Sequence, residues 1–257
     1  MYTDSHAHLT APSVLPSVDA ILARAKEHHV DKIVNICTDE KSLQEGLILA
    51  ARYNWVFNAA ATTPHDVEKE GESFFPLVES AAQAGKLIAI GETGLDYFYE
   101  HSDKKCQIAF LVRYFHLAKV HRLPLIIHCR DAFSDLFKYA DAEYSKSPAV
   151  LHCFTGTLDE AKEVLKREWY LSLSGIITFK KAEALREVVA YVPLEHMLIE
   201  TDTPYLAPQS NRGKQNEPAF IYETCALIAS IKGVDFREVA RITSLNATKF
   251  FSFPKHV

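Results

Sequence analysis

LPLIIHC at residues 123–129 and LIAIG at residues 87–91 are the two stretches of this sequence that decide its fold. Both are short and almost entirely apolar, which is typical of parallel strands covered by other elements on both faces. Further short apolar runs recur along the chain and alternate with longer segments of helical period. The eight predicted strands span residues 2–6, 32–38, 55–61, 87–92, 123–129, 149–154, 170–175 and 197–202.

Segments in which apolar residues recur with a helical period lie between these strands and after the last one. The predicted helices span residues 17–29, 41–52, 73–84, 104–121, 131–146, 158–168, 181–190, 218–232 and 235–247. Thr38 and Thr157 each precede such a segment, with acidic residues in its first turn, and are predicted N-caps. The alternation predicts a parallel sheet, and the buried strands favour a single α/β domain over residues 1–257 that forms a (β/α)8 TIM barrel.

The composition supports a compact protein and excludes several functional classes. The chain has 257 residues, of which 48% are hydrophobic and 24% charged, enough to bury a sizeable core. A net charge of −5 argues against a protein that coats nucleic acid through bulk positive potential, but a nuclease with bound dications is compatible with it. The five cysteines show no CxxC spacing, so we expect neither a disulfide framework nor a cysteine zinc site.

The amino terminus and the hydropathy of the chain bear on its location. MYTDSHAHLT, residues 1–10, lacks a basic patch followed by an apolar run. No stretch of the sequence reaches the roughly 18 apolar residues that a membrane span requires. We therefore expect a cytoplasmic protein that makes no contact with a membrane.

Histidines and carboxylates stand at the carboxyl ends of five predicted strands. In a barrel of parallel strands these ends meet on one face, where active sites are built. A single histidine at a strand end is more often a packing residue, so the prediction rests on the whole set. The predicted metal ligands are His6, His8, Glu92, His128, His152 and Asp202.

This set is larger than one tetrahedral ion needs. Imidazoles and carboxylates suit borderline divalent metals, and we therefore expect two divalent ions, which could be Zn, Mg or Mn. A carboxylate can bridge two cations that would otherwise repel each other, and Glu92 is the predicted bridge. Asp202 is expected to hold the attacking water, so Glu92 and Asp202 are the predicted catalytic residues. Asp4, on the same strand face as His6, is a candidate for orienting a ligand.

A second group of residues is predicted at the mouth of the barrel. Arg130 follows His128 and could reach a phosphate, although a salt bridge with Asp131 or Asp135 is an equal alternative. Tyr97, with the two aromatic residues after it, could stack on unpaired bases or simply pack at the rim. The remaining predicted substrate-binding residues are His65 and, in the long loop 203–217, Arg212.

The motifs of this chain resemble those of the TatD family of metal-dependent deoxyribonucleases, within the amidohydrolase superfamily. They are SHAHL at 5–9, GETGLDY at 91–97, LPLIIHCRDA at 123–132, HCFTG at 152–156, ETDTPYLAP at 200–208 and NEP at 216–218. The resemblance runs almost from end to end. It implies a dinuclear site on the six residues selected above and hydrolysis of DNA phosphodiesters, often from a 3′ end, with Asp202 as the base.

Two positions depart from the pattern of that family. The family usually has His-Pro-His after the third strand, where this chain has Thr63-Pro64-His65. A glutamine that is common before the fifth strand is replaced by Tyr114. Neither position belongs to the six expected ligands, so these departures bear on substrate preference rather than on the chemistry.

The expected function is therefore a deoxyribonuclease whose partner is DNA, single-stranded or at 3′ ends. Two rival functions stay open on the sequence. The same site could hydrolyse an amide, an ester or a lactone, because activated water also attacks carbonyl groups. A non-catalytic barrel that keeps metal only for stability is the second rival.

Overall fold

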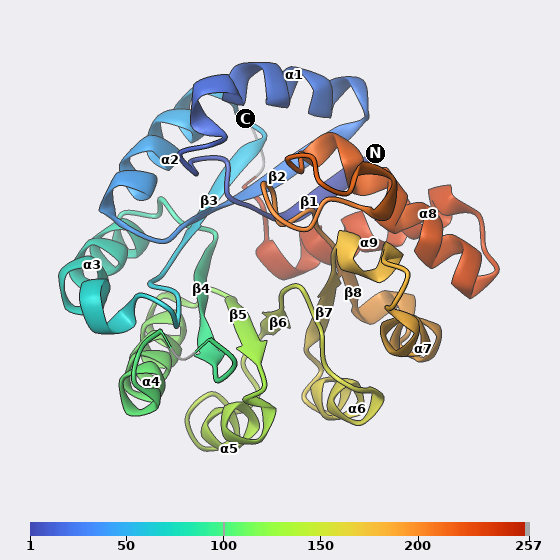
Figure 1. Ribbon diagram of the computed structural model, residues 1–257. Coiled ribbons are helices and arrows are strands. Elements are labelled where there is room, and N and C mark those ends of the chain that lie inside the picture. The colour runs from blue at the N-terminus through green and yellow to red at the C-terminus, as the bar shows by residue number, and fades with distance from the viewer. Residues whose placement is uncertain (100, 255–257) are drawn as a thin grey trace.

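The computed structural model describes residues 1–99 and 101–254. Over these residues eight strands form one sheet in the order β1 to β8, and each strand runs parallel to the next. The strands are β1 Tyr2–Ala7, β2 Val30–Cys37, β3 Val56–Ala60, β4 Ala89–Asp96, β5 Leu125–Arg130, β6 Ala149–Leu151, β7 Tyr170–Leu173 and β8 Met197–Ile199. Figure 1 shows the sheet curled into a barrel inside a ring of helices, which confirms the predicted (β/α)8 fold.

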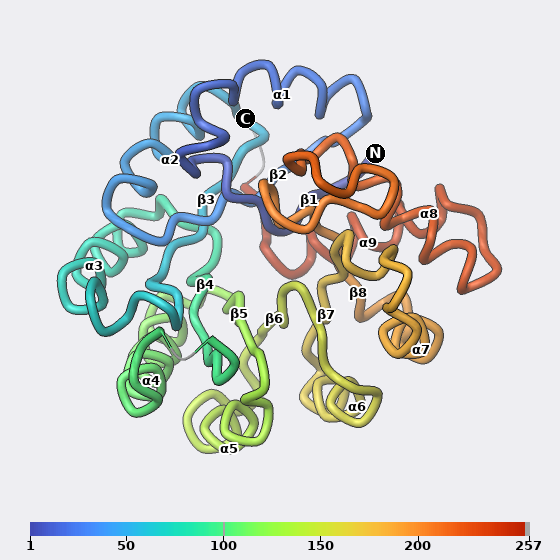
Figure 2. The backbone as a smooth tube through the Cα atoms, in the orientation of Figure 1, coloured from blue at the N-terminus to red at the C-terminus, as the bar shows by residue number. Residues whose placement is uncertain are grey.

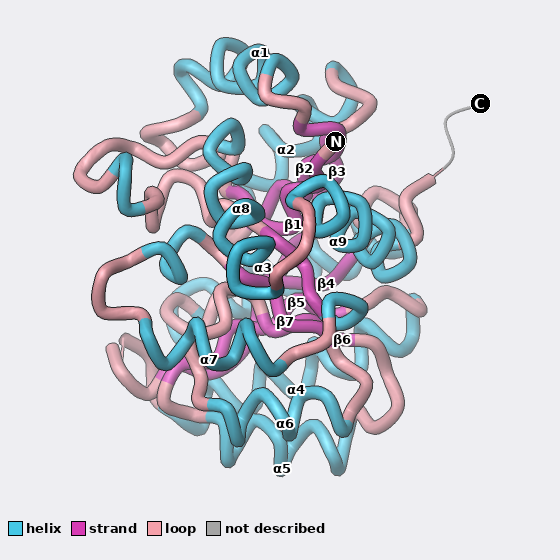
Figure 3. Tube along the Cα trace, turned by 90° about the vertical axis from the view of Figure 1, so that its right-hand side faces the viewer, coloured by secondary structure: helices cyan, strands magenta, loops and turns pink. Residues whose placement is uncertain are grey.

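The first seven α-helices connect successive strands and lie outside the barrel, and two more follow the last strand. They are α1 Val18–Glu27, α2 Glu40–Arg52, α3 Val67–Gln83, α4 Lys104–His121, α5 Phe133–Glu143, α6 Leu158–Lys166, α7 Glu183–Tyr191, α8 Ile221–Lys232 and α9 Phe236–Phe251. The side view in Figure 3 places the strands at the centre with helices around them. Within the described residues, no helix combines the length and the apolar composition needed to cross a membrane.

The barrel is closed by the chain that follows β8. Ala7 of β1 forms an isolated parallel bridge with Thr203. Two backbone hydrogen bonds extend this contact, from the N–H of Asp202 to the carbonyl of His6 at 2.9 Å and from the N–H of His8 to the carbonyl of Thr203 at 2.7 Å. Figure 2 shows the orange segment after β8 returning beside the dark blue first strand. The first and last predicted ligands are therefore brought together by backbone pairing.

Two hydrophobic clusters flank the sheet, one inside the barrel and one between strands and helices. The inner cluster contains residues that point inward from β2 to β6 and β8, together with the end of α9, whose Phe250 and Phe251 plug the bottom of the barrel. Ile126, Val150 and Leu198 belong to this inner cluster. Because side chains alternate along a strand, the residues two positions further on also point inward, and they emerge at the top of the barrel.

Several element boundaries differ from the prediction. Helix α3 begins at Val67 rather than at residue 73 and contains Pro76, because its first turns pack closely on α4: a methyl group at Gly71 would meet the Phe110 ring. Asp39, not Thr38, caps α2, since its side chain accepts the N–H of Ser42. The last three strands end before their predicted limits, while the predicted N-cap of α6, Thr157, is confirmed by a complete capping box.

Candidate metal centre

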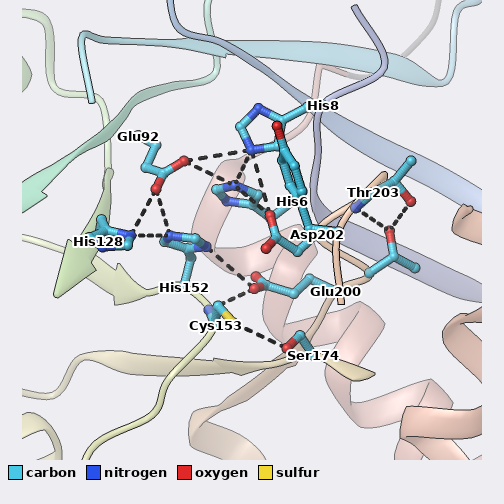
Figure 4. A network of polar contacts seen from close by, with 12 residues as sticks. His6, His8, Glu92, His128, His152, Cys153, Ser174, Glu200, Asp202 and Thr203 are labelled. Atoms are coloured by element: carbon cyan, nitrogen blue, oxygen red, sulfur yellow. Dashed lines mark hydrogen bonds and ion pairs between the residues drawn. The ribbon is translucent and has the colours of Figure 1, made fainter. Parts of the chain in front are cut away.

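Six side chains meet at the top of the barrel, and they are the six that the sequence predicts as ligands. Figure 4 shows them converging from β1, β4, β5 and the segments that follow β6 and β8. The side chains of Ile126 and Val150 belong to the inner cluster. His128 and His152 stand two positions further along the same strand paths, so they also face the interior of the barrel. All six residues lie outside α-helices, in strands or in the segments that directly follow them, where the chemistry of such barrels is usually built.

The first donor set joins β1 to the carboxylates of Glu92 and Asp202. His6 Nε2 lies 3.3 Å from His8 Nε2 and 3.4 Å from Glu92 Oε2. Asp202 Oδ1 lies 3.6 Å from the same nitrogen of each histidine, and His8 Nε2 is 3.7 Å from Glu92 Oε2. Two nitrogens and two oxygens therefore face one point.

The second donor set uses the other oxygen of Glu92. His128 Nδ1 lies 3.0 Å and His152 Nε2 lies 2.8 Å from Glu92 Oε1. The two imidazole nitrogens are 3.2 Å apart. Each carboxylate oxygen of Glu92 thus serves a different donor set, and the side chain joins the two.

The spacing of these atoms can be compared with the geometry of a bound ion. Histidine nitrogens and carboxylate oxygens bind zinc at about 2.0–2.2 Å, so two neighbouring ligands of a tetrahedral ion lie about 3.3–3.6 Å apart. The distances in the first set, from 3.3 to 3.7 Å, fit this value. The second set, at 2.8 to 3.2 Å, is tighter and would open by a few tenths of an ångström around a cation. The residues present fit two divalent cations.

The electrostatics of the cluster favour an ionised carboxylate among imidazoles. Burial alone would raise the pKa of Glu92, but the neighbouring His152, His128 and His6 outweigh it and hold that pKa well below its usual range. Burial would lower the pKa of His152, yet the charges of Glu92 and Glu200 raise it well above the usual value. The carboxylates therefore stabilise positive charge in the cluster, and either protons or divalent cations can supply this charge.

The cluster also contains polar atoms whose hydrogen-bonding capacity is not used. Among the residues that the structure describes, the buried side-chain atoms without a hydrogen-bond partner are His6 Nδ1, His65 Nδ1, His152 Nδ1 and Glu200 Oε2. All four belong to the cluster or to side chains in contact with it. Buried polar atoms of this kind are rare in native proteins and concentrate where a site serves binding or catalysis rather than stability.

Two carboxylates behind the ligands were not predicted from the sequence. Asp96 Oδ2 lies 2.9 Å from His128 Nε2, on the side of the ring opposite Glu92. Glu200 Oε1 lies 3.5 Å from His152 Nδ1 and accepts the backbone N–H of Cys153 at 2.6 Å. Asp96 stands four positions after the predicted ligand Glu92, and Glu200 stands two positions before the predicted ligand Asp202. The period of two along a strand is the signal that could have found them.

Asp202 is held in place by Asp4, which the sequence predicts as an orienting residue, and by Asn216, which it does not. Asp4, the candidate orienting residue, accepts hydrogen bonds from the N–H and hydroxyl of Thr201, at 2.9 and 2.6 Å. Asn216 donates to the carbonyls of Thr201 and Tyr205, at 2.7 Å each. The short segment that carries Asp202 is thus bound on both sides, by β1 and by the start of the NEP motif.

The structure brings two of the four predicted substrate-binding residues toward the centre. The His65 ring lies 5.5 Å from the ring of His128, and its Nε2 is 3.7 Å from Asp96 Oδ2. The Arg130 guanidinium lies over the rings of Phe98 and Tyr99, at 3.7 and 4.9 Å. Among the described residues, the contacts of the Arg130 guanidinium are with these two rings and include no ion pair to Asp131 or Asp135.

Tyr97 and Arg212 lie elsewhere. The Tyr97 hydroxyl donates to Asp135 at 2.8 Å, and its ring packs against the outer core, which favours the rim-packing interpretation. The exposed Arg212 stacks on Phe179 at 3.9 Å. Neither residue has a contact with the six clustered side chains among the contacts of the described residues.

The two departures from the family pattern both bear on the segment that leads to His65. The buried Tyr114 hydroxyl accepts the N–H of Thr62 at 2.9 Å and also lies 2.9 Å from the hydroxyl of Thr62. Thr63 follows directly, and its hydroxyl donates to Asp66 at 3.1 Å. Both unusual residues therefore shape the segment that presents His65, and not the ligand cluster.

The barrel and the cluster at the carboxyl ends of its strands define a metal-dependent hydrolase of the TIM-barrel type. The family model described as TatD related DNase matches residues 3–252. The chain therefore belongs to the TatD family, and it is an enzyme of the metal-dependent hydrolase class.

Named relatives match the chain over nearly its whole length. An "Uncharacterized metal-dependent hydrolase YabD" of Bacillus subtilis is 35% identical, with 98% of this chain and 99% of the relative covered. The "3'-5' ssDNA/RNA exonuclease TatD" of Citrobacter rodentium is 32% identical, with 96% and 97% covered. The crystal structure of YJJV, a TatD homolog from Escherichia coli, superposes with a TM-score of 0.92 at 27% identity and covers 98% of both chains.

Proposed function

We propose that this protein is a nuclease that hydrolyses DNA phosphodiester bonds with two divalent cations bound by His6, His8, Glu92, His128, His152 and Asp202. The observation that carries the proposal is the division of the Glu92 carboxylate, whose Oε2 faces one donor set and whose Oε1 faces the other. A bridging carboxylate is what two cations in one site require. The relative named as an exonuclease on single-stranded DNA and RNA supports the choice of substrate class.

The chain's own residues divide the work of the reaction. When bound, two divalent cations would lower the pKa of a water molecule and offset charge on the phosphoryl oxygens. Asp202, whose Oδ1 faces His6 and His8 in the first donor set, accepts the proton of the attacking water. Glu92 keeps the two donor sets at a fixed separation. Arg130 at the mouth meets the negative charge of the substrate backbone.

The test is cleavage of end-labelled single-stranded DNA by protein that has been stripped with a chelator and reloaded with Zn, Mn or Mg. Asp202→Asn is expected to lower kcat by roughly 100-fold to 10,000-fold, because it removes the base. Asp141→Asn is the matched control, since Asp141 lies on the outer helix α5 and forms an exposed ion pair with Arg167. Metal analysis of each variant separates loss of the base from loss of a ligand.

Three results would contradict the proposal in different ways. Metal-replete protein that hydrolyses a carbonyl ester but no phosphodiester would assign the same site to the other substrate class. An Asp202→Asn variant as active as the Asp141→Asn control would remove Asp202 from the reaction. A preparation that binds DNA equally well with and without Asp202, and turns over neither substrate, would point to a binding protein.

A further inference from the structure

An exposed group of aromatic rings and one guanidinium lies next to the candidate metal centre. Phe98 and Tyr99 follow β4 and are 53% and 51% exposed, which is unusual for large aromatic side chains. Their rings meet edge to face at 4.9 Å between centroids. The Arg130 guanidinium covers Phe98 at 3.7 Å and reaches Tyr99 at 4.9 Å. We call Phe98, Tyr99 and Arg130 the aromatic rim.

The aromatic rim is continuous with the metal centre through His65. The Tyr99 ring lies 5.7 Å from the ring of His65, which in turn lies 5.5 Å from the ring of the candidate ligand His128. Both contacts are close to perpendicular, at 70° and 68°. If one part of an extended ligand were bound at the metal centre, the adjacent part of the same ligand would therefore lie over the aromatic rim.

A single buried carboxylate holds the rim in register with the centre. Asp96 Oδ1 accepts the backbone N–H groups of Phe98 and Tyr99, at 3.0 and 2.8 Å. Its other oxygen, Oδ2, lies 2.9 Å from His128 Nε2. Asp96 is completely buried, so this junction lies inside the protein and is not a surface contact. The position of the two exposed rings is thus set by the residue that also orients a candidate ligand.

We propose that the aromatic rim is a stacking platform for an unpaired base adjacent to the phosphodiester that is cleaved. The inference rests on the proposed function and adds to it the residues that select single-stranded nucleic acid. Bases stack on aromatic side chains regardless of their identity, because every base has a π face, and arginine adds a cation–π contribution. A base held in a duplex cannot offer its face to Phe98 or Tyr99.

The chemistry of the rim favours a nucleic acid over other occupants. Arg130 brings a permanent positive charge to an apolar surface, and a phosphodiester chain offers both an aromatic base and a negative charge within one residue. The net charge of the protein is −5, so its overall field does not attract an anionic chain. The local positive charge of Arg130 therefore contributes more to that attraction than it would on a basic protein. A purely apolar ligand would gain nothing from the guanidinium.

The experiment measures how much the bases of a ligand contribute to binding. Metal-loaded protein carrying Asp202→Asn, which slows turnover, is titrated by fluorescence anisotropy with a single-stranded oligonucleotide and with a chain of the same length made entirely of abasic residues. We expect the ordinary oligonucleotide to bind more tightly. Phe98→Ala and Tyr99→Ala should each reduce that preference by roughly 5-fold to 100-fold and leave affinity for the abasic chain unchanged.

Tyr191→Ala is the matched control. Tyr191 is also 51% exposed, but it is the last residue of the outer helix α7 and faces Lys162. Its loss should leave both affinities unchanged. Metal content of each variant is measured in parallel, so that a disturbed centre is recognised and not mistaken for a lost stacking contact.

The outcomes separate this inference from the proposed function. If the protein binds both chains equally, or if Phe98→Ala and Tyr99→Ala behave like Tyr191→Ala, the platform is overturned even when the wild-type protein cleaves DNA. If the wild type cleaves no phosphodiester but the two variants lose base-dependent binding, the platform stands and the proposed reaction fails. The binding measurement needs no turnover, so each result decides the question.

Discussion

At the scale of single residues, Asp96 links the candidate ligand His128 to the aromatic rim. Its two oxygens face different partners: one accepts the N–H groups that follow β4, and the other faces His128 Nε2. Burial would raise the pKa of Asp96, but the hydrogen bonds from His128 and from the Tyr99 backbone lower it to about 2. The carboxylate is therefore ionised at neutral pH and fixes which nitrogen of His128 carries a proton.

Asp96→Asn tests this role. The amide keeps an oxygen for the backbone of Phe98 and Tyr99 but removes the charge that faces His128. We expect metal affinity to fall by roughly 10-fold to 100-fold, as is typical when a partner behind a histidine ligand is lost. Competition titration against a chromophoric chelator measures it.

Asp135→Asn is the control for that prediction, because Asp135 accepts a hydrogen bond from Tyr97 and has no contact with a candidate ligand among the contacts of the described residues. It should leave metal affinity as in the wild type. Equal affinity for Asp96→Asn and Asp135→Asn would show that His128 needs no orienting carboxylate.

At the scale of secondary-structure elements, a buried amide network holds the end of β1 against its neighbours. Asn35 of β2 accepts the N–H of Leu9 at 2.9 Å and donates to Asn58 of β3 at 2.9 Å. Asn58 in turn donates to the carbonyl of Gly46 in α2 at 2.8 Å. Leu9 directly follows His8, so this network supports the chain on which two candidate ligands stand.

Asn35→Ala should destabilise the protein. The change leaves the buried N–H of Leu9 without its acceptor, which costs roughly 1–3 kcal/mol. Urea unfolding at a fixed metal concentration measures the loss of free energy of unfolding. Asn54→Ala, in the exposed turn before β3, should stay within about 0.5 kcal/mol of the wild type. Similar values for both variants would show that the network contributes nothing specific.

At the scale of the whole molecule, the candidate centre draws on the entire barrel. Its ligands come from both ends of the chain, and the backbone bonds between β1 and the segment after β8 bring His6 and Asp202 together. The bottom of the same barrel is filled by Phe250 and Phe251 of α9. Cations at the top would thus stabilise a closure to which distant parts of the chain contribute.

Removal of metal should therefore lower the thermal stability of the whole protein. Metal at 100 times its Kd stabilises the folded state by about 2.7 kcal/mol, which corresponds to a Tm difference of roughly 5–10 °C for a protein of this size. Calorimetry of chelator-treated and reloaded protein measures the difference. Glu92→Gln, which keeps the shape but loses the bridging charge, should show a smaller shift. Identical Tm values for both states of the wild type would argue against binding to the folded centre.

Much of this architecture can be predicted from the chain alone. Apolar runs such as 123–129 identify strands buried on both faces, because only those strands lack polar residues at every second position. The same period places His128 and His152 inward at strand ends. The clustering of all six predicted ligands follows from that rule and from the convergence of parallel strands at one end of a barrel.

The residues around the ligands are brought there by contacts between segments far apart in the chain. Local sequence patterns do not predict such contacts. Asp96 meets His128 across 32 positions, and Glu200 meets Cys153 across 47. Tyr97 and the two aromatic residues after it are all stacking candidates in the sequence, but only tertiary contacts decide that the Tyr97 hydroxyl donates to Asp135 of α5 while Phe98 and Tyr99 face solvent. The sequence by itself determined the barrel and the donors at its strand ends, because periodicity and strand direction are local properties. The tertiary structure alone decided which side chains orient those donors and line the approach to them, because such pairings depend on how neighbouring elements pack.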